Sequence, residues 1–216
     1  MIKNIIFDMD GVLIKDMHRH VYCWKKALKN HGIRIPNKEF YLKEGAGNQD
    51  YLGLILKSQG IKISMAKRIK IHDLKLELFQ KKGKTQPYRI LKYLQKLKNA
   101  KINIAVATGG DKKIATPEIN NFFPEIFSVI MTGDDVKKTK PFPEEYEKTL
   151  KKMKAKKNET LVIENAPYGI QAAKSAGLRV YAIETTLSRD HLLEADLIFK
   201  NHKQLFKQLF KELNIK

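Results

Sequence analysis

The sequence predicts an α/β protein in which a doubly wound, mostly parallel sheet is interrupted by an all-helical insert. Two observations predict this class. Short apolar runs alternate with helical patterns along most of the chain, whereas residues 16–82 carry helical patterns only. Strands that alternate with helices form βαβ units, whose sheet is mostly parallel. The apolar runs that we expect to form strands cover 5–7, 102–107, 127–131, 160–163, 179–183 and 197–199.

The composition sets limits on the class of protein. The chain has 216 residues, 43% of them hydrophobic, which suits a large domain with its own core and argues against disorder. Cys23 is the only cysteine, so no disulfide framework is expected within one chain. The sequence shows no secretory signal and no run long enough to span a membrane. We expect a cytoplasmic protein without a membrane partner, either a monomer or a weak homodimer.

The formal net charge of +19 raises the question of a nucleic-acid partner. The basic residues are spread over the chain, lysine outnumbers arginine, and no aromatic pattern interleaves with the basic runs. We therefore do not expect nucleic acid to be the main partner. A diffuse positive field would still attract small phosphorylated anions.

Helix signals mark the insert and the segment that follows it. Asp16 is a candidate N-cap for the first helix of the insert, and Gly32 ends that helix. Beyond the insert, Pro87 is expected to open a helix with apolar residues at 90, 91, 94 and 97.

Two carboxylates follow the first strand. Asp8 and Asp10 stand one residue apart, and Gly11 can take the turn after them. In open α/β sheets, ligands bind beyond the carboxyl ends of the strands. Two carboxylates there can hold Mg²⁺, and one of them can form an aspartyl-phosphate. The simpler alternative is a loop with two solvated acids.

Other strand ends also carry polar groups. Thr108 follows the second strand, and the backbone N–H of Gly109 beside it can approach an anion closely. Lys140 stands in a loop that the following proline stiffens, although taken alone it could be a surface cation. Glu164 and Asn165 end the fourth strand.

These residues together resemble a known family. The segments Asp8-x-Asp10-Gly11-Val12-Leu13, Thr108, Lys140-Pro141 and Glu164-Asn165-Ala166-Pro167-x-Gly169 look like the four motifs of haloacid dehalogenase-like hydrolases. The resemblance covers the whole chain. It implies a Rossmann-like catalytic core of residues 1–15 and 83–216 and a helical cap, 16–82, that sets substrate specificity. The chain is most similar to the branch that holds small-molecule phosphatases and β-phosphoglucomutase.

The resemblance also implies a role for each motif. Asp8 would attack phosphorus, and Asp10 would serve as general acid and then as general base. Thr108, Gly109 and Lys140 would bind the phosphoryl oxygens. The ligands of the Mg²⁺ cofactor would be Asp8, Asp10, Glu164 and Asn165.

Asn165 departs from the family pattern, because many relatives have an aspartate there. An amide oxygen can bind Mg²⁺ but brings no charge. We therefore expect a weaker metal site in which Glu164 is the main ligand of the pair, and we expect Asn165→Asp to tighten Mg²⁺ binding.

The cap is expected to supply the residues that bind the rest of the substrate. The resemblance implies that His20 faces the active site, although it could instead be an exposed histidine on a polar helix face. The segment 43–48 looks like the loop of the cap that contacts the substrate, in which Lys43 would meet an anionic group. Asn48 or Gln49 stands where mutases hold an arginine that binds a second phosphate. Loss of that grip disfavours a mutase and favours hydrolysis.

The sequence thus predicts a Mg²⁺-dependent phosphatase of small phosphorylated metabolites that works through an aspartyl-phosphate. One alternative is a β-phosphoglucomutase-like isomerase. An alternative of another class is a basic nucleic-acid-binding protein with little catalysis. We expect the cap to move as a lid, with hinges near Ile14–Lys15 and Gly83–Lys84.

Overall fold

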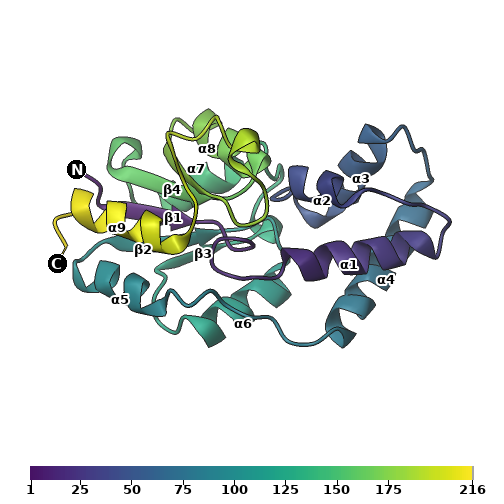
Figure 1. Cartoon of the computed structure of the whole chain (residues 1–216), viewed down its shortest axis with the longest axis horizontal. Helices are drawn as coiled ribbons and strands as arrows, with labels where there is room; N and C mark the ends of the chain where they lie inside the picture. Colours follow the sequence, from purple (N-terminus) through teal and green to yellow (C-terminus); the bar gives the residue numbers. More distant parts are fainter. Residues whose placement is uncertain (216) are drawn as a thin grey trace.

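A computed structural model describes residues 1–215, apart from the side chains of residues 48–50. Within that range, six parallel strands form one sheet in the order β3-β2-β1-β4-β5-β6 (Figure 1). This topology confirms the predicted doubly wound α/β class. The strands are β1 (Asn4–Phe7), β2 (Asn103–Ala107), β3 (Val129–Met131), β4 (Thr160–Glu164), β5 (Arg179–Ile183) and β6 (Leu197–Phe199).

Strand β1 lies at the centre of the sheet, between β2 and β4. Successive side chains of a strand point to opposite faces, so Ile5 and Phe7 pack into one core cluster and Ile6 into the other. Both faces are covered, which explains why Ile5, Ile6 and Phe7 are all apolar. The chain crosses from one half of the sheet to the other here, and such switch points are where α/β proteins bind ligands.

Helices cover both faces of the sheet. Buried residues of α5 (Leu91–Asn99), α6 (Lys112–Phe122) and α9 (His202–Glu212) pack with Phe7, whereas α7 (Glu144–Met153) and α8 (Pro167–Ser175) pack with Ile6. Three single 3₁₀ turns complete this part of the chain: η1 (Gly133–Asp135), η2 (Lys157–Glu159) and η3 (Arg189–His191).

Four helices form the cap, which lies beside the carboxyl ends of the strands (Figure 1). They are α1 (Met17–Lys29), α2 (Asn37–Leu42), α3 (Asn48–Ser58) and α4 (Met65–Lys81). The cap has its own apolar core, to which Trp24, Phe40, Ile55 and Ile71 belong. The all-helical insert is confirmed, since the described residues between 16 and 82 contain no strand.

One of two local predictions was wrong. Asp16 stands at the N-cap position of α1, as predicted, although its side chain makes no cap hydrogen bond and its Oδ2 accepts hydrogen bonds from Arg19 and Thr85. Pro87 does not open a helix. It pairs with Ile14 in an antiparallel bridge where the chain enters and leaves the cap, and α5 begins only at Leu91.

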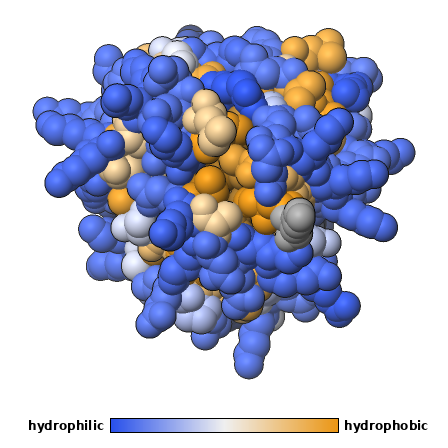
Figure 2. Space-filling model, turned by 90° about the vertical axis from the view of Figure 1, so that its left-hand side faces the viewer, coloured by the Kyte–Doolittle hydropathy of each residue, from blue (hydrophilic) through white to orange (hydrophobic). Residues whose placement is uncertain are grey.

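The surface at the end of the molecule remote from the cap is mostly hydrophilic (Figure 2). Figure 2 views the molecule from the end remote from the cap, where hydrophilic side chains surround a small apolar area. No helix within residues 1–215 is both long enough and apolar enough to cross a membrane.

Candidate active site

The predicted strand-end residues meet at one edge of the sheet. Asp8 follows β1, Thr108 follows the neighbouring strand β2, and Glu164 ends β4 on the other side of β1. The backbone N–H of Asp8 continues the ladder by donating to Ile163 O (2.9 Å). All three side chains are buried. Parallel pairing therefore places the polar ends of three strands side by side.

Lys140 reaches this edge from the loop before α7 and is buried there. Its ammonium donates hydrogen bonds to Asp8 Oδ1 (2.6 Å), Glu164 Oε1 (2.8 Å) and Ala107 O (3.1 Å). A third carboxylate, that of Glu145, lies 3.9 Å from Lys140 Nζ. Burial would lower the pKa of Lys140, but Asp8 and Glu164 raise it well above its usual value. The ammonium is therefore fixed in its charged form.

Negative charge is in excess around Lys140, since three buried carboxylates share one ammonium. Burial raises the pKa of Asp8 well above its ordinary value, against the opposing attraction of Lys140. Burial likewise raises the pKa of Glu145 to about 7. The excess negative charge of such a buried site is neutralised when a carboxylate binds a proton or when a cation binds.

Glu164 is held by several donors. Its Oε1 accepts from Lys140 and from Tyr146 Oη (2.6 Å), and its Oε2 accepts from the backbone N–H of Asn165 (3.0 Å). The carboxylate lies against Gly169, where a Cβ atom would stand 1.8 Å from Oε1. Only glycine fits at that position. In this arrangement Oε1 of Glu164 orients the Lys140 ammonium, and a metal ion would compete with Lys140 for that oxygen.

Asp10 stands on the tight loop that follows β1, where Gly11 has a φ of +80°. Burial, and then the charges of Asp16 and Glu118, raise the pKa of Asp10 to about 7. A carboxyl group with a pKa near the working pH can both give and take a proton. Asp10 therefore has the property that the predicted general acid and base requires.

The cap loop is closed over the core loop after β2. A Cβ atom on Gly109 would lie 2.5 Å from the carbonyl oxygen of Gly45, so the two backbones touch. The Gly47 N–H also donates to Thr139 Oγ1 (3.0 Å). Thr108 Oγ1 accepts from the Gly110 N–H (3.1 Å), which shapes the core loop.

A second cap contact reaches the fourth motif. Asn165 Nδ2 donates to Glu44 Oε1 (2.7 Å) and to Thr186 Oγ1 (3.0 Å). Glu44 is buried, and burial raises its pKa well above the ordinary value, against the hydrogen bond from Asn165. Sequence reasoning placed Glu44 in the predicted substrate-contacting loop, 43–48, but gave its carboxyl group no role of its own.

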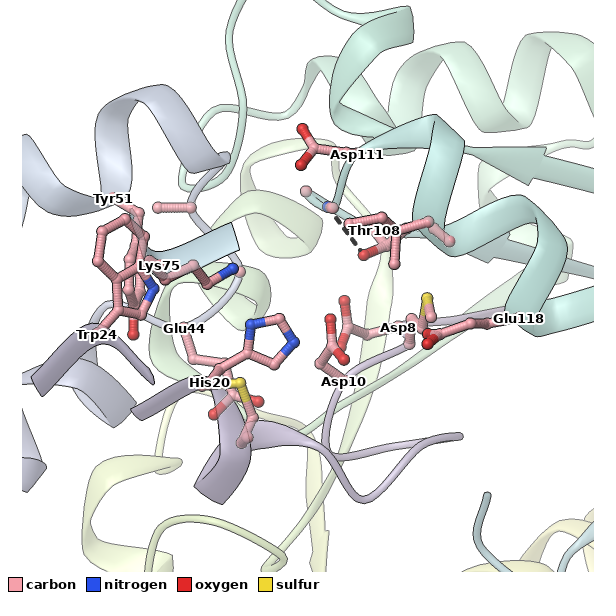
Figure 3. Close-up of a pocket in the computed structure, with 18 residues that line it drawn as sticks. Asp8, Asp10, His20, Trp24, Glu44, Tyr51, Lys75, Thr108, Asp111 and Glu118 are labelled. Carbon is pink, nitrogen blue, oxygen red and sulfur yellow. Dashed lines mark hydrogen bonds between the residues drawn. The ribbon is translucent and has the colours of Figure 1, made fainter. Parts of the chain in front are cut away.

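The cap and the core line a cavity of about 70 Å³ between them. Its wall includes the predicted residues Asp8, Asp10, Thr108, Gly109 and His20 (Figure 3). Residues that sequence reasoning missed also line it: Trp24, Glu44, Tyr51, Lys75, Asp111 and Glu118.

The predicted cap residues have different outcomes. His20 lines the cavity; burial and the charge of Lys75 lower its pKa well below the usual value, so its ring is neutral. Lys43 lies elsewhere, with its ammonium 4.0 Å from Glu39 and 5.8 Å from the ring centre of Tyr168. The side chain of Asn48 lies outside the described residues, so its role stays a prediction.

The donor chemistry at this edge fits Mg²⁺, which takes hard oxygen ligands. Asn165 Oδ1 and Glu44 Oε2 are buried and have no hydrogen-bond partner in the described part of the chain. No three His, Cys, Asp or Glu side chains among the described residues already form a metal cage. The Lys140 ammonium stands between Asp8 and Glu164 instead.

Comparisons with known proteins identify related chains. A family model described as haloacid dehalogenase-like hydrolase matches residues 5–183. The chain is 26% identical to validoxylamine A 7'-phosphate phosphatase of Streptomyces hygroscopicus subsp. limoneus, covering 93% of this chain and 94% of the relative. It is 27% identical to the phosphorylated carbohydrates phosphatase of Thermotoga maritima, covering 91% and 92%.

Two solved structures are also similar. A protein of Bacteroides vulgatus proposed to be a β-phosphoglucomutase superposes with a TM-score of 0.89 at 34% identity, covering 99% of this chain and 89% of its own. CbbY of Rhodobacter sphaeroides, in complex with phosphate, superposes with a TM-score of 0.78 at 25% identity, covering 95% and 96%.

Proposed function

Because the chain belongs to the haloacid dehalogenase-like hydrolases, and is thus a hydrolase of phosphate esters, we propose that it is a Mg²⁺-dependent phosphatase of a small phosphorylated metabolite. The reaction would pass through an aspartyl-phosphate on Asp8. The observation that carries the proposal is the cluster in which Lys140 Nζ lies 2.6 Å from Asp8 Oδ1, beside Asp10 and under a closed cap.

In the first step, a carboxylate oxygen of Asp8 attacks phosphorus, and the bond from phosphorus to the ester oxygen breaks. The leaving oxygen takes a proton from Asp10, whose pKa of about 7 leaves a large protonated fraction at neutral pH. Lys140 and the loop from Thr108 to Gly109 would hold the phosphoryl oxygens while their negative charge is redistributed.

In the second step, Asp10 takes a proton from water, and the resulting nucleophile attacks the phosphorus of the aspartyl-phosphate. The bond from phosphorus to Asp8 breaks, phosphate leaves, and the Asp8 carboxylate is restored. The closed cap keeps bulk water out of the first step.

The Mg²⁺ ligands that we propose are Asp8, the backbone carbonyl of Asp10, Glu164 and Asn165, with Glu44 at hand to supply a further oxygen. When bound, the ion neutralises charge on the phosphoryl oxygens and on Asp8. The buried, unpartnered oxygens of Asn165 and Glu44 support this ligand set.

A β-phosphoglucomutase-like isomerase is the second candidate, and the likeness to the Bacteroides vulgatus structure favours it. The absence of any arginine between Arg34 and Arg68 argues against an isomerase. In such an enzyme the second phosphate of the bisphosphate intermediate must stay bound while the intermediate reorients in the active site. Interconversion of sugar phosphates that depends on glucose 1,6-bisphosphate, without net phosphate release, would decide for the isomerase.

The test is a screen of phosphate release from a panel of phosphorylated sugars, acids and nucleotides, with and without Mg²⁺, for wild type and Asp8→Asn. We expect Mg²⁺-dependent release that Asp8→Asn lowers more than about a hundredfold, since an amide cannot form the acyl-phosphate. Retention of more than about a hundredth of the activity would remove Asp8 as nucleophile. No release from any substrate, together with a salt-sensitive mobility shift on nucleic acid, would favour a nucleic-acid-binding protein instead.

A further inference from the structure

Lys75 is a buried cation of the cap that the mechanism above does not use. It lies on α4, is 1% exposed and lines the catalytic cavity. Its ammonium lies 5.3 Å from the ring centre of Trp24 and 5.1 Å from that of Phe79. Figure 3 shows the side chain entering the cavity beside Trp24, on the side opposite Asp8.

The Lys75 ammonium is not paired. Within the described residues it makes no hydrogen bond and no ion pair, in contrast to Lys140, which makes three hydrogen bonds. Asp10 and Asp111 act on it only through space, and burial lowers its pKa to about 8. Burying a cation without a partner is costly, so an anion bound in the cavity would stabilise the Lys75 ammonium.

We propose that Lys75 binds an anionic group on the leaving part of the substrate, a carboxylate or a second phosphate. The proposal rests on the proposed phosphatase activity at Asp8. The phosphoryl group lies among Asp8, Lys140 and Thr108, so the leaving part extends across the cavity toward the cap. Lys75 stands where that part ends, and the faces of Trp24 and Phe79 help to hold its ammonium in place.

The size of the cavity narrows the substrate class further. Its volume of about 70 Å³ is far below the roughly 300 Å³ at which pockets for drug-sized ligands begin. A cavity of this size suits a two-carbon phosphorylated acid or a pair of linked phosphates better than a phosphorylated hexose. The substrate that we infer is therefore compact and carries two anionic groups.

The test compares two pairs of substrates that differ in the second anionic group. Phosphoglycolate is paired with 2-hydroxyethyl phosphate, and pyrophosphate with methyl phosphate. We expect the wild type to prefer the anionic member of at least one pair by about tenfold or more in kcat/KM, as hydrogen bonds between charged groups commonly give. The pair that shows the preference identifies the anion as carboxylate or phosphate.

Lys75→Met should lower kcat/KM for the anionic member by about tenfold or more beyond any loss on the neutral member, so that the preference disappears. Lys82→Met is the matched control, because Lys82 also lies over an aromatic ring, that of Tyr22, but is exposed and does not line the cavity. It should leave both substrates unaffected.

The outcomes separate this inference from the proposed function. If Lys75→Met loses kcat/KM equally on both members of each pair, Lys75 has a structural role and the inference is wrong. The proposed phosphatase activity would not be affected by that result. Wild type without a preference for an anionic member would overturn it even if Lys75→Met fails to fold. If the wild type releases phosphate from none of these substrates, nor from the panel of sugars, acids and nucleotides described above, the proposed phosphatase activity is wrong.

Discussion

Glu44 of the cap and Asn165 of the core are joined by a hydrogen bond of 2.7 Å from Asn165 Nδ2 to Glu44 Oε1. The amide that replaces a charged residue of the fourth motif thus faces an acid that the cap provides. Glu44 brings a carboxyl group from the cap to position 165, where the core itself has an amide.

This contact changes the expected effect of Asn165→Asp. From the sequence alone, the substitution should tighten Mg²⁺ binding. In the structure, it would replace the amide donor that faces Glu44 by a second buried acid, so that either one of the two acids binds a proton or two like charges are buried together. We therefore expect Asn165→Asp alone to lower kcat/KM by about tenfold or more, corresponding to roughly 1.4 kcal/mol.

The exchanged pair Glu44→Gln with Asn165→Asp restores one acid and one amide. We expect it to recover most of the activity that Asn165→Asp loses. The measurement is a double-mutant cycle on kcat/KM and on the Mg²⁺ concentration for half-maximal activity. Additive effects of the two substitutions would show that Glu44 and Asn165 act independently.

The pKa of Asp10 predicts a pH dependence. The proton that the leaving group takes is present below a pKa of about 7 and is lost above it. We expect kcat/KM to fall as the pH rises through that value. Because Glu118 raises the pKa of Asp10, Glu118→Gln should move this alkaline limb to lower pH. If kcat/KM of Glu118→Gln falls at the same pH as that of the wild type, a group other than Asp10 controls the decrease.

Glu145 predicts a pH dependence of stability. Burial raises its pKa from 4.5 to about 7, so between these values the folded state binds a proton that the unfolded state does not. The free energy of unfolding should therefore rise as the pH falls from about 7 toward 4.5, by on the order of 2 kcal/mol from this residue. Urea unfolding at pH 5.5 and 8 measures the difference between wild type and Glu145→Gln. Equal pH dependence in the two proteins would contradict the assignment.

Gly109 predicts an effect on cap closure. A Cβ atom there would lie 2.5 Å from Gly45 O, and neither backbone can yield as a flexible side chain would. We expect Gly109→Ala to hold the cap partly open and to lower kcat/KM by at least about tenfold, since closure completes the site.

Gly53→Ala is the control for cap closure, because a Cβ at Gly53 meets only the flexible end of Arg68. Small-angle scattering with a metal fluoride as phosphate mimic should show compaction of wild type and Gly53→Ala, but less compaction of Gly109→Ala. Identical profiles for all three proteins would argue against a moving lid.

The order of the strands and helices was predictable from the sequence, because the period of the apolar pattern is a local property. The same holds for Asp8, Thr108 and Glu164, since the carboxyl ends of neighbouring parallel strands must meet. The starts of individual elements were less predictable. Pro87 has helix-opening chemistry, yet tertiary pairing with Ile14 decides its conformation.

The sequence by itself determined the α/β class, the helical insert and the polar strand ends, since each depends on residues near one another in the chain. Only the tertiary structure decided which side chains meet. Lys140 reaches Asp8 across 132 positions and Asn165 reaches Glu44 across 121, and the second contact joins the core to the cap. The same holds for Lys75, whose place in the cavity follows from the packing of α4 against Trp24, and no local pattern distinguishes it from the other lysines of the chain.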